Sequence, residues 1–220
     1  MGVILLVRHG QASFGSADYD VLSAAGERQA HRLGDALAAR GVAPLSVICG
    51  SLRRQRDTAD AMIKQAGWAL GASTDVGWDE FELSGLVADT PAGQERQDRG
   101  AYQDALEVGM RRWAGPGPGS TGGSSVGGMS FADFTARAES ALRAAAAAQP
   151  RGATTLVVTS GGVIGWIAAS LLGAGVEQWI RLNRVCVNTG VTTLVTGRRG
   201  ISLVAFNDHS HLSPQEVSYR

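Results

Sequence analysis

The chain is 220 residues long, and its 44% hydrophobic and 18% charged residues are proportions typical of a globular protein rather than a disordered one. Its 20 basic and 20 acidic residues cancel to a net charge of zero, which argues against nucleic acid or an acidic membrane as a bulk partner. No stretch approaches the roughly 20 apolar residues of a membrane span, and the apolar run at residues 3–7 is too short for a signal peptide. We therefore expect a cytoplasmic location.

Strands and helices alternate along the chain. Residues 3–7 are a continuous run of leucine and β-branched residues, typical of a strand buried on both faces. A helix is expected to begin after Ser23 as its N-cap and to end at Gly41, with Leu33 and Leu37 on its buried face. The later predictions, in chain order, are a strand at 45–49, a helix at 53–66, an irregular helix at 92–113, a helix at 131–148, a strand at 154–159, an apolar helix at 160–173, and strands near 190–196 and 201–206.

This alternation predicts an α/β fold, a three-layer sandwich with a mainly parallel sheet and helices on both faces. Residues 114–128 are rich in glycine, serine and proline and predict a flexible loop. Because the strand pattern resumes after this loop, we expect residues 1–220 to form a single domain that contains it. Functional residues of such folds lie at the carboxyl ends of the strands.

The two cysteines do not suggest a metal site. Cys49 and Cys186 lie far apart in the sequence, with no CxxC or histidine-rich spacing around them. Buried free thiols are therefore expected rather than a disulfide or a metal site. The sequence predicts neither a metal nor a cofactor.

Three segments follow predicted strands and carry groups suited to an anion. Arg8, His9 and Gly10 end the first strand. "SLRRQRDTA" at residues 51–59 places arginines near a helix N-terminus, and "VVTSGG" at 157–162 opens a helix with free backbone N–H groups. Each segment also has a plain structural reading: a solvated arginine beside an incidental histidine, a basic helical turn paired with acidic neighbours, and an ordinary strand-to-helix turn.

Taken together and in order, these segments resemble the histidine phosphatase superfamily, in its phosphoglycerate-mutase-like branch. The family pattern is a strand ending in RHG, then "LS/T..G..QA", "S.L.R....TA", an acidic segment, and a late strand ending in HGG. This chain has Arg8-His9-Gly10, "LSAAGERQA" at 22–30, "SLRRQRDTA" at 51–59, "WDEFE" at 78–82 and "TSGG" at 159–162. The resemblance covers nearly the whole chain and implies a mixed sheet and a covalent phosphohistidine mechanism.

The resemblance assigns roles to four residues. His9 matches the nucleophile, since a neutral imidazole can attack phosphorus and divide one difficult displacement into two. Arg8 and Arg54 match the arginines that hold the equatorial phosphoryl oxygens. Glu80 matches the general acid, which protonates the leaving alkoxide and then activates water. Glu82 and Asp79 are the alternatives for that role, and Arg53, Arg56 and His31 are expected to be solvated.

Two departures from the family pattern stand out. Ser160 occupies the place of the second histidine before Gly-Gly, and its hydroxyl is a shorter, uncharged donor. The missing donor could come from Ser160, from the helix N-terminus at Gly161 and Gly162, or from His209 and His211, although these tail histidines are expected on the surface. After RHG, Gln11 and Ser13 stand where the family has other residues, and they are predicted to take over part of the phosphate contact.

The leading hypothesis is a metal-independent phosphomonoesterase that acts on a small phosphorylated metabolite. A second is a weakly active or inactive relative that binds phosphorylated ligands, with Ser160 as its best support. A serine hydrolase using Ser160 and a tail histidine is disfavoured, because "VTSGG" lacks the first glycine of the G-x-S-x-G elbow. A phosphoglycerate-type mutase is disfavoured because "EFEL" lacks the "E..YG" stretch. The expected partner is a small phosphorylated substrate, with homodimer formation left open.

Overall fold

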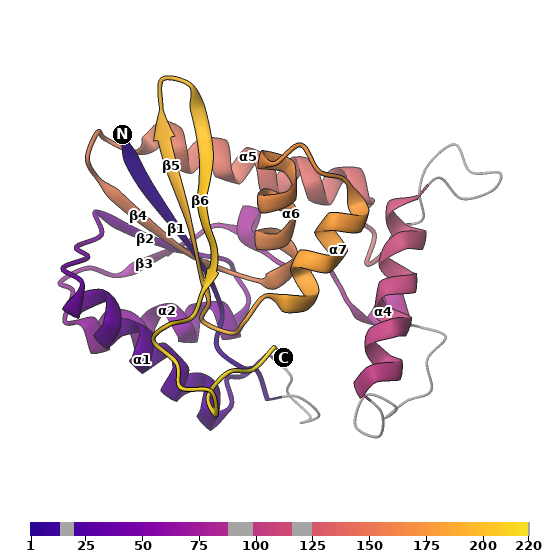
Figure 1. Ribbon diagram of the computed structural model, residues 1–220, viewed down its shortest axis with the longest axis horizontal. Coiled ribbons are helices and arrows are strands. Elements are labelled where there is room, and N and C mark those ends of the chain that lie inside the picture. The colour runs from indigo at the N-terminus through magenta and orange to yellow at the C-terminus, as the bar shows by residue number, and fades with distance from the viewer. Residues whose placement is uncertain (14–19, 88–98, 116–124, 220) are drawn as a thin grey trace.

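A six-stranded mixed sheet forms the centre of the protein (Figure 1). The computed structural model describes residues 1–13, 20–87, 99–115 and 125–219. Strand order is β3-β2-β4-β1-β5-β6, in which β3, β2, β4 and β1 run parallel and β5 is antiparallel to both of its neighbours, β1 and β6. The strands are β1 (Gly2–Arg8), β2 (Ser46–Cys49), β3 (Ala72–Thr74), β4 (Thr154–Thr159), β5 (Val191–Gly197) and β6 (Gly200–Asp208).

Helices cover both faces of the sheet, which confirms the predicted three-layer α/β fold (Figure 1). Helices α1 and α2 pack on one face, and α5, α6 and α7 lie on the other. The helices are α1 (Ala24–Ala39), α2 (Arg53–Ala66), α4 (Arg99–Ala114), α5 (Phe131–Ala148), α6 (Gly161–Leu171) and α7 (Val176–Val185), with short 3-10 helices η1 (Val76–Trp78) and η2 (Ser84–Val87).

Strand β1 shows why the apolar run at residues 3–7 is continuous. Leu5 and Val7 face the cluster beneath α1 and α2, while Ile4 and Leu6 face the cluster beneath α5, α6 and α7. Successive side chains of a strand point to opposite faces, so a strand buried on both faces must be apolar throughout. This central position carries Arg8 and His9 to the carboxyl edge of the sheet.

Several boundaries differ from the sequence prediction. Strand β3 and helix α7 are not predicted, because β3 is only three residues long and α7 buries only Trp179 and Ile180. The helix expected at 92–113 is α4, which the structure describes from Arg99. Of the predicted loop at 114–128, residues 116–124 lie outside the described part of the chain.

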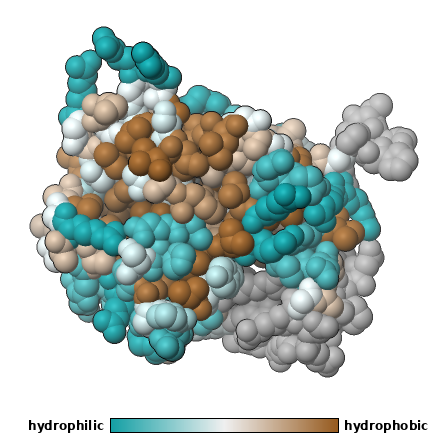
Figure 2. Space-filling view, in the orientation of Figure 1, coloured by the Kyte–Doolittle hydropathy of each residue, from teal (hydrophilic) through white to brown (hydrophobic). Residues whose placement is uncertain are grey.

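Strand β6 ends the sheet on one side and is half covered. Its exposure alternates, with Ile201 and Leu203 packed against the core and Val204 61% exposed. Figure 2 shows apolar residues gathered over this part of the visible face. Among the described helices, none is long and apolar enough to span a bilayer.

Candidate active site

Two neighbouring parallel strands end at the same edge of the sheet. Arg8 of β1 pairs with Thr159 of β4, and the backbone N–H of His9 donates to the Thr159 carbonyl at 2.8 Å. His9 and Ser160 therefore follow these strands side by side. Helix α2 begins just after β2, which lies on the other side of β4, and brings Arg54 to the same place. The structure thus brings together His9, Arg8, Arg54 and Ser160, as expected for residues that each follow a strand.

The His9 ring is held as a neutral imidazole. Its Nδ1 lies 2.8 Å from the Gly10 carbonyl oxygen, which can only accept a hydrogen bond, so Nδ1 carries the proton. The Nε2 lone pair is then available, and it accepts from Arg54 Nε at 3.2 Å. Burial, followed by the charges of Arg54 and Arg8, lowers the pKa of His9 well below its usual value of 6.5. An unprotonated Nε2 is the form that a nucleophile requires.

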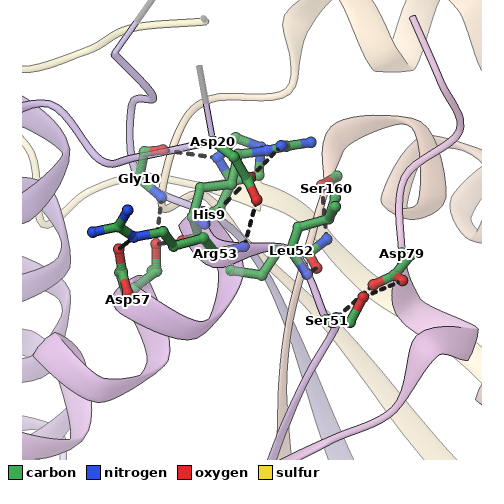
Figure 3. A network of polar contacts seen from close by, with 12 residues as sticks. His9, Gly10, Asp20, Ser51, Leu52, Arg53, Asp57, Asp79 and Ser160 are labelled. Carbon is green, nitrogen blue, oxygen red and sulfur yellow. Dashed lines mark hydrogen bonds and ion pairs between the residues drawn. The ribbon is translucent and has the colours of Figure 1, made fainter. Parts of the chain in front are cut away.

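Arg54 is buried and held by an acidic partner that the sequence did not reveal. Its Nη1 lies 2.6 Å from Asp20 Oδ1, and Asp20 also accepts from the Arg53 backbone N–H at 2.7 Å at the start of α2 (Figure 3). One carboxylate therefore caps the helix and orients the arginine. Asp20 precedes Arg54 by more than 30 residues, so no local spacing links the two.

Arg8 reaches the start of α6. Its Nη1 donates to the carbonyl oxygens of Cys186 and Tyr219, the latter at 2.7 Å. Its Nε is buried and has no hydrogen-bond partner within the described chain. A Cβ at Gly161 would lie only 3.5 Å from that Nε, so the unpaired N–H lies beside the N-terminus of α6. A buried unpaired donor next to a helix N-terminus is suited to an anion.

Glu80 also reaches the N-terminus of α6. Its Oε2 accepts from the Gly162 N–H at 2.9 Å, and Oε1 accepts from the Phe81 N–H at 3.2 Å. A Cβ at Gly162 would come within 2.4 Å of Glu80 Oε1, so this close approach requires glycine. Burial raises the pKa of Glu80, and these hydrogen bonds with the nearby arginines offset only part of the rise. A carboxyl with a raised pKa is suited to donate a proton.

The two alternatives to Glu80 are placed differently. Asp79 accepts from the Ser51 N–H at 2.5 Å and from the Ser51 hydroxyl at 2.6 Å (Figure 3). Glu82 is exposed, and a Cβ at Gly127 would lie 2.2 Å from its Oε2, so Glu82 points toward the turn at Gly127. These contacts favour Glu80 as the acid.

Ser160 is 1% exposed and precedes α6 as its N-cap, although its side chain makes no capping hydrogen bond. Its Oγ instead accepts from Gln55 Nε2 at 2.9 Å. The tail histidines are half-buried rather than on the surface. His211 Nε2 lies 3.0 Å from Thr189 Oγ1 and His209 Nδ1 lies 2.7 Å from the Asn207 carbonyl, and in the described chain neither bonds to Ser160.

Gln11 and Ser13 use their side chains at the start of α1. Gln11 Oε1 accepts from the Ser23 hydroxyl at 2.9 Å, and the Ser13 hydroxyl donates to the Leu22 carbonyl at 3.1 Å. Ser23 also caps α1 as expected, accepting from the Gly26 N–H. The predicted phosphate contacts of Gln11 and Ser13 therefore stay predictions. Among the remaining candidates, Arg53, Arg56 and His31 are exposed, as expected.

Two buried residues that sequence analysis missed, Asn188 and Gln29, bind the carboxyl-terminal segment. The buried Asn188 donates from Nδ2 to the His9 carbonyl at 3.0 Å, and its backbone N–H donates to the Ser218 carbonyl at 2.9 Å. Gln29 binds the same segment, donating from Nε2 to the Glu216 carbonyl and to the Ser218 hydroxyl. The tail thus returns to the site and closes against it. It has no periodic pattern from which this return could be predicted.

A cavity of about 520 Å³ lies beside these residues. It is bordered by Gln11, Gln29, Gln103 and the tail from Gln215 to Tyr219. His9 itself is 5% exposed and does not line it. Across the part of the chain that the structure describes, no group of three histidine, cysteine, aspartate or glutamate residues could hold a metal ion.

Comparisons with known proteins agree with this geometry. The sequence profile of the histidine phosphatase superfamily, branch 1, matches residues 4–209. No curated protein sequence is detectably similar to this chain.

Solved structures share the fold. A mycobacterial glucosyl-3-phosphoglycerate phosphatase, in complex with inorganic phosphate, is 25% identical, with 96% of this chain and 99% of that chain covered and a TM-score of 0.65. A phosphoserine phosphatase mutant from Entamoeba histolytica, in complex with phosphoserine, is 20% identical, covering 97% and 100% of the two chains with a TM-score of 0.68. YhfR from Bacillus stearothermophilus is 21% identical, covering 96% and 99%, with a TM-score of 0.71.

A profile match over nearly the whole chain, phosphatases among the structural neighbours, and a buried histidine near the charges of two arginines all lead to one assignment. The chain belongs to branch 1 of the histidine phosphatase superfamily and is an enzyme of the phosphatase class.

Proposed function

We propose that the protein is a metal-independent phosphomonoesterase that acts on a small phosphorylated metabolite through a phosphohistidine intermediate. The observation that carries this proposal is the state of His9. Its Nδ1 donates to the Gly10 carbonyl, its Nε2 is unprotonated, and the Nε2 lone pair accepts from Arg54 Nε at 3.2 Å. The two arginines supply the positive charge that a metal would otherwise provide.

The first step transfers the phosphoryl group to the enzyme. When substrate binds, Arg54 Nε–H turns from His9 Nε2 to a phosphoryl oxygen and so releases the lone pair. The nitrogen forms a bond to phosphorus while the bond from phosphorus to the ester oxygen breaks. Glu80 donates its proton to the departing alkoxide, and the product alcohol leaves. The unpaired Nε–H of Arg8 and the Gly161 N–H at the start of α6 hold the equatorial oxygens, while the Gly162 N–H stays bonded to Glu80.

The second step regenerates the enzyme. Glu80, now ionised, takes a proton from a water molecule whose oxygen attacks phosphorus. The bond from phosphorus to His9 Nε2 breaks, and inorganic phosphate is released. Glu80 is thereby protonated again, ready for the next substrate.

The cavity beside the site is assigned to the alcohol half of the substrate. It borders Gln11, two residues beyond His9, and Tyr219, whose carbonyl accepts from Arg8. Its volume of about 520 Å³ is within the usual range for small-molecule pockets. Polar amides on its walls favour an alcohol with several hydrogen-bonding groups.

A panel of phosphomonoesters tests the proposal, with phosphate release measured for the wild type and for His9→Ala. We expect hydrolysis of at least one small ester, unchanged by a chelator and abolished in His9→Ala. Brief incubation with substrate should add the mass of one phosphoryl group to the wild type and not to His9→Ala. Activity that survives His9→Ala but is lost in Ser160→Ala would instead identify a serine hydrolase.

The alternative of a weakly active binding protein has one specific observation in its favour, the uncharged and buried Ser160 at the end of β4. It predicts phosphate binding by the wild type with no release of phosphate from any ester in the panel.

A further inference from the structure

We propose that Gln55 is a positioning residue that makes the Ser160 hydroxyl a hydrogen-bond donor to the transferring phosphoryl group. The inference rests on the proposed phosphatase function and deepens it. Gln55 lies next to Arg54 on α2, is 0% exposed, and takes no part in the mechanism described so far. Figure 3 draws Ser160 and His9 in the same network of polar contacts, and Ser160 Oγ accepts from Gln55 Nε2 at 2.9 Å.

Backbone groups determine which way the Gln55 amide faces. Its Oε1 accepts from the Leu52 N–H at 3.3 Å, and that N–H can only donate. Its Nε2 donates to the Trp78 carbonyl at 3.2 Å, and that oxygen can only accept. The oxygen and nitrogen of the amide therefore cannot be exchanged without breaking both contacts. The second Nε2 hydrogen is left for Ser160 Oγ, at 2.9 Å.

This contact determines the role of the Ser160 hydroxyl. Because Gln55 donates, Ser160 Oγ accepts, and the hydroxyl hydrogen must be directed elsewhere. Within the described chain, the hydroxyl donates to no protein acceptor. Thr159 pairs with Arg8 in the parallel register, so Ser160 lies next to His9 at the strand ends. The acceptor for the Ser160 hydroxyl hydrogen is then an oxygen of the phosphoryl group on His9.

Room for the Gln55 amide is built into the neighbouring backbone. A Cβ at Gly50 would lie 2.0 Å from Gln55 Oε1 and 2.7 Å from Asp79 Oδ1. Residue 50 must therefore lack a side chain for the amide to sit where it does. Helix capping accounts for the contact to Leu52, but it does not require the contacts to Trp78 and Ser160.

Four proteins test the inference: the wild type, Ser160→Ala, Gln55→Met and the double variant. Methionine keeps the length of the side chain and removes its polar ends. If Gln55 acts through Ser160, each single variant lowers kcat by roughly tenfold, the effect of one neutral hydrogen bond. The double variant then falls no further than either single one, within about twofold. KM should change little if only the Ser160 donor is lost. A rise in KM would instead indicate that Arg54 has been displaced.

Vanadate affinity is measured on the same four proteins, so that the result does not depend on turnover alone. We expect both single variants and the double variant to bind vanadate about tenfold more weakly than the wild type. Gln65→Met, an exposed substitution on the same helix, is the matched control and should leave kcat and vanadate binding unchanged. Thermal unfolding shows whether each variant is folded at the assay temperature.

The outcomes separate the two proposals. If esters are hydrolysed but Gln55→Met retains wild-type kcat and vanadate affinity, the role of Gln55 is wrong and the phosphatase proposal stands. If the effects of Gln55→Met and Ser160→Ala multiply in the double variant, Gln55 does not act through Ser160, and the inference also fails. If no ester is hydrolysed but vanadate affinity follows the expected pattern, Gln55 still positions Ser160, and the phosphatase proposal fails.

Discussion

The two groups that we propose to react, His9 and Glu80, are held by different kinds of interaction. His9 directly follows a central strand and is held by hydrogen bonds, from Nδ1 to Gly10, from Asn188 to its carbonyl, and from Arg54 to Nε2. Glu80 lies in irregular chain between η1 and η2. Trp78, two residues before Glu80, and Phe81, directly after it, are buried and anchor this segment in the core.

The anchor of Glu80 is a cluster of aromatic rings. Phe81 lies 5.1 Å from both Trp113 and Phe134 and 5.8 Å from Trp179, measured between ring centroids. Such rings interact at preferred distances and angles, so they define the direction from which Glu80 enters the site. The buried cluster beneath α1 and α2 is aliphatic apart from Cys49 and Met62, although α2 on this face carries Arg54. On the aromatic face, therefore, we expect packing to matter for catalysis as well as for stability.

The largest expected effect is on the acid itself. Glu80→Gln should lower kcat by roughly 10²–10⁴-fold for esters of ordinary alcohols, the usual contribution of a general acid. Esters whose leaving group is acidic, such as nitrophenyl phosphate, should lose much less in the first step, because their leaving oxygen needs no proton. Asp79→Asn and Glu82→Gln are the matched controls. A larger loss in either of them would show that the acid has been assigned to the wrong carboxyl.

The pH dependence of kcat/KM gives a second test of the roles proposed for His9 and Glu80. His9 must be neutral to attack, and its lowered pKa keeps it neutral well below pH 6.5. Glu80 must be protonated to donate, and its raised pKa extends that form above pH 4.5. We therefore expect kcat/KM to fall as the pH rises through the pKa of Glu80 in the folded enzyme. In Glu80→Gln, this alkaline fall should disappear from the pH profile, and its persistence would point to another group.

Two large-to-small substitutions test whether packing on the two faces of the sheet differs in its effect on kcat. Phe81→Ala and Leu33→Ala each remove a buried side chain and should lower the free energy of unfolding by about 2–5 kcal/mol. Only Phe81→Ala should also lower kcat of the folded protein, because it loosens the segment that carries Glu80. Denaturant unfolding and kcat per folded molecule are measured together. An equal loss of kcat in Leu33→Ala would show that the two faces do not differ.

The smallest effect is expected at Ser160. In Ser160→His, the imidazole would extend into the space of the Gln55 amide, now 2.9 Å from the serine oxygen. Overfilling a buried site costs roughly 1–3 kcal/mol, and we expect kcat to fall several-fold. Adding Gln55→Ala should recover part of this loss by making room. A Ser160→His variant that is more active than the wild type would show that the pocket was underfilled.

The sequence by itself determined the layers of the fold and the edge of the sheet at which Arg8, His9 and Arg54 meet. Apolar runs and helical periodicity depend on local spacing, and they placed β1, α1, α2, β4 and α6 close to where the structure has them. Arg8 ends β1, His9 follows it and Arg54 follows β2, so their meeting at one edge is a consequence of parallel topology. The order of the motifs along the chain was sufficient to identify the family.

Only the tertiary structure decided how these residues are held. Asp20 reaches Arg54, Gln55 reaches Ser160, and the tail returns to Arg8 and Gln29 across 34 to 211 positions of sequence. A side-chain hydrogen bond depends on an angle and a distance of about 3 Å, and no periodic pattern along the chain encodes such a pairing between distant segments. Apolar burial is non-directional and leaves a periodic trace, whereas these directional contacts exist only after the layers have packed.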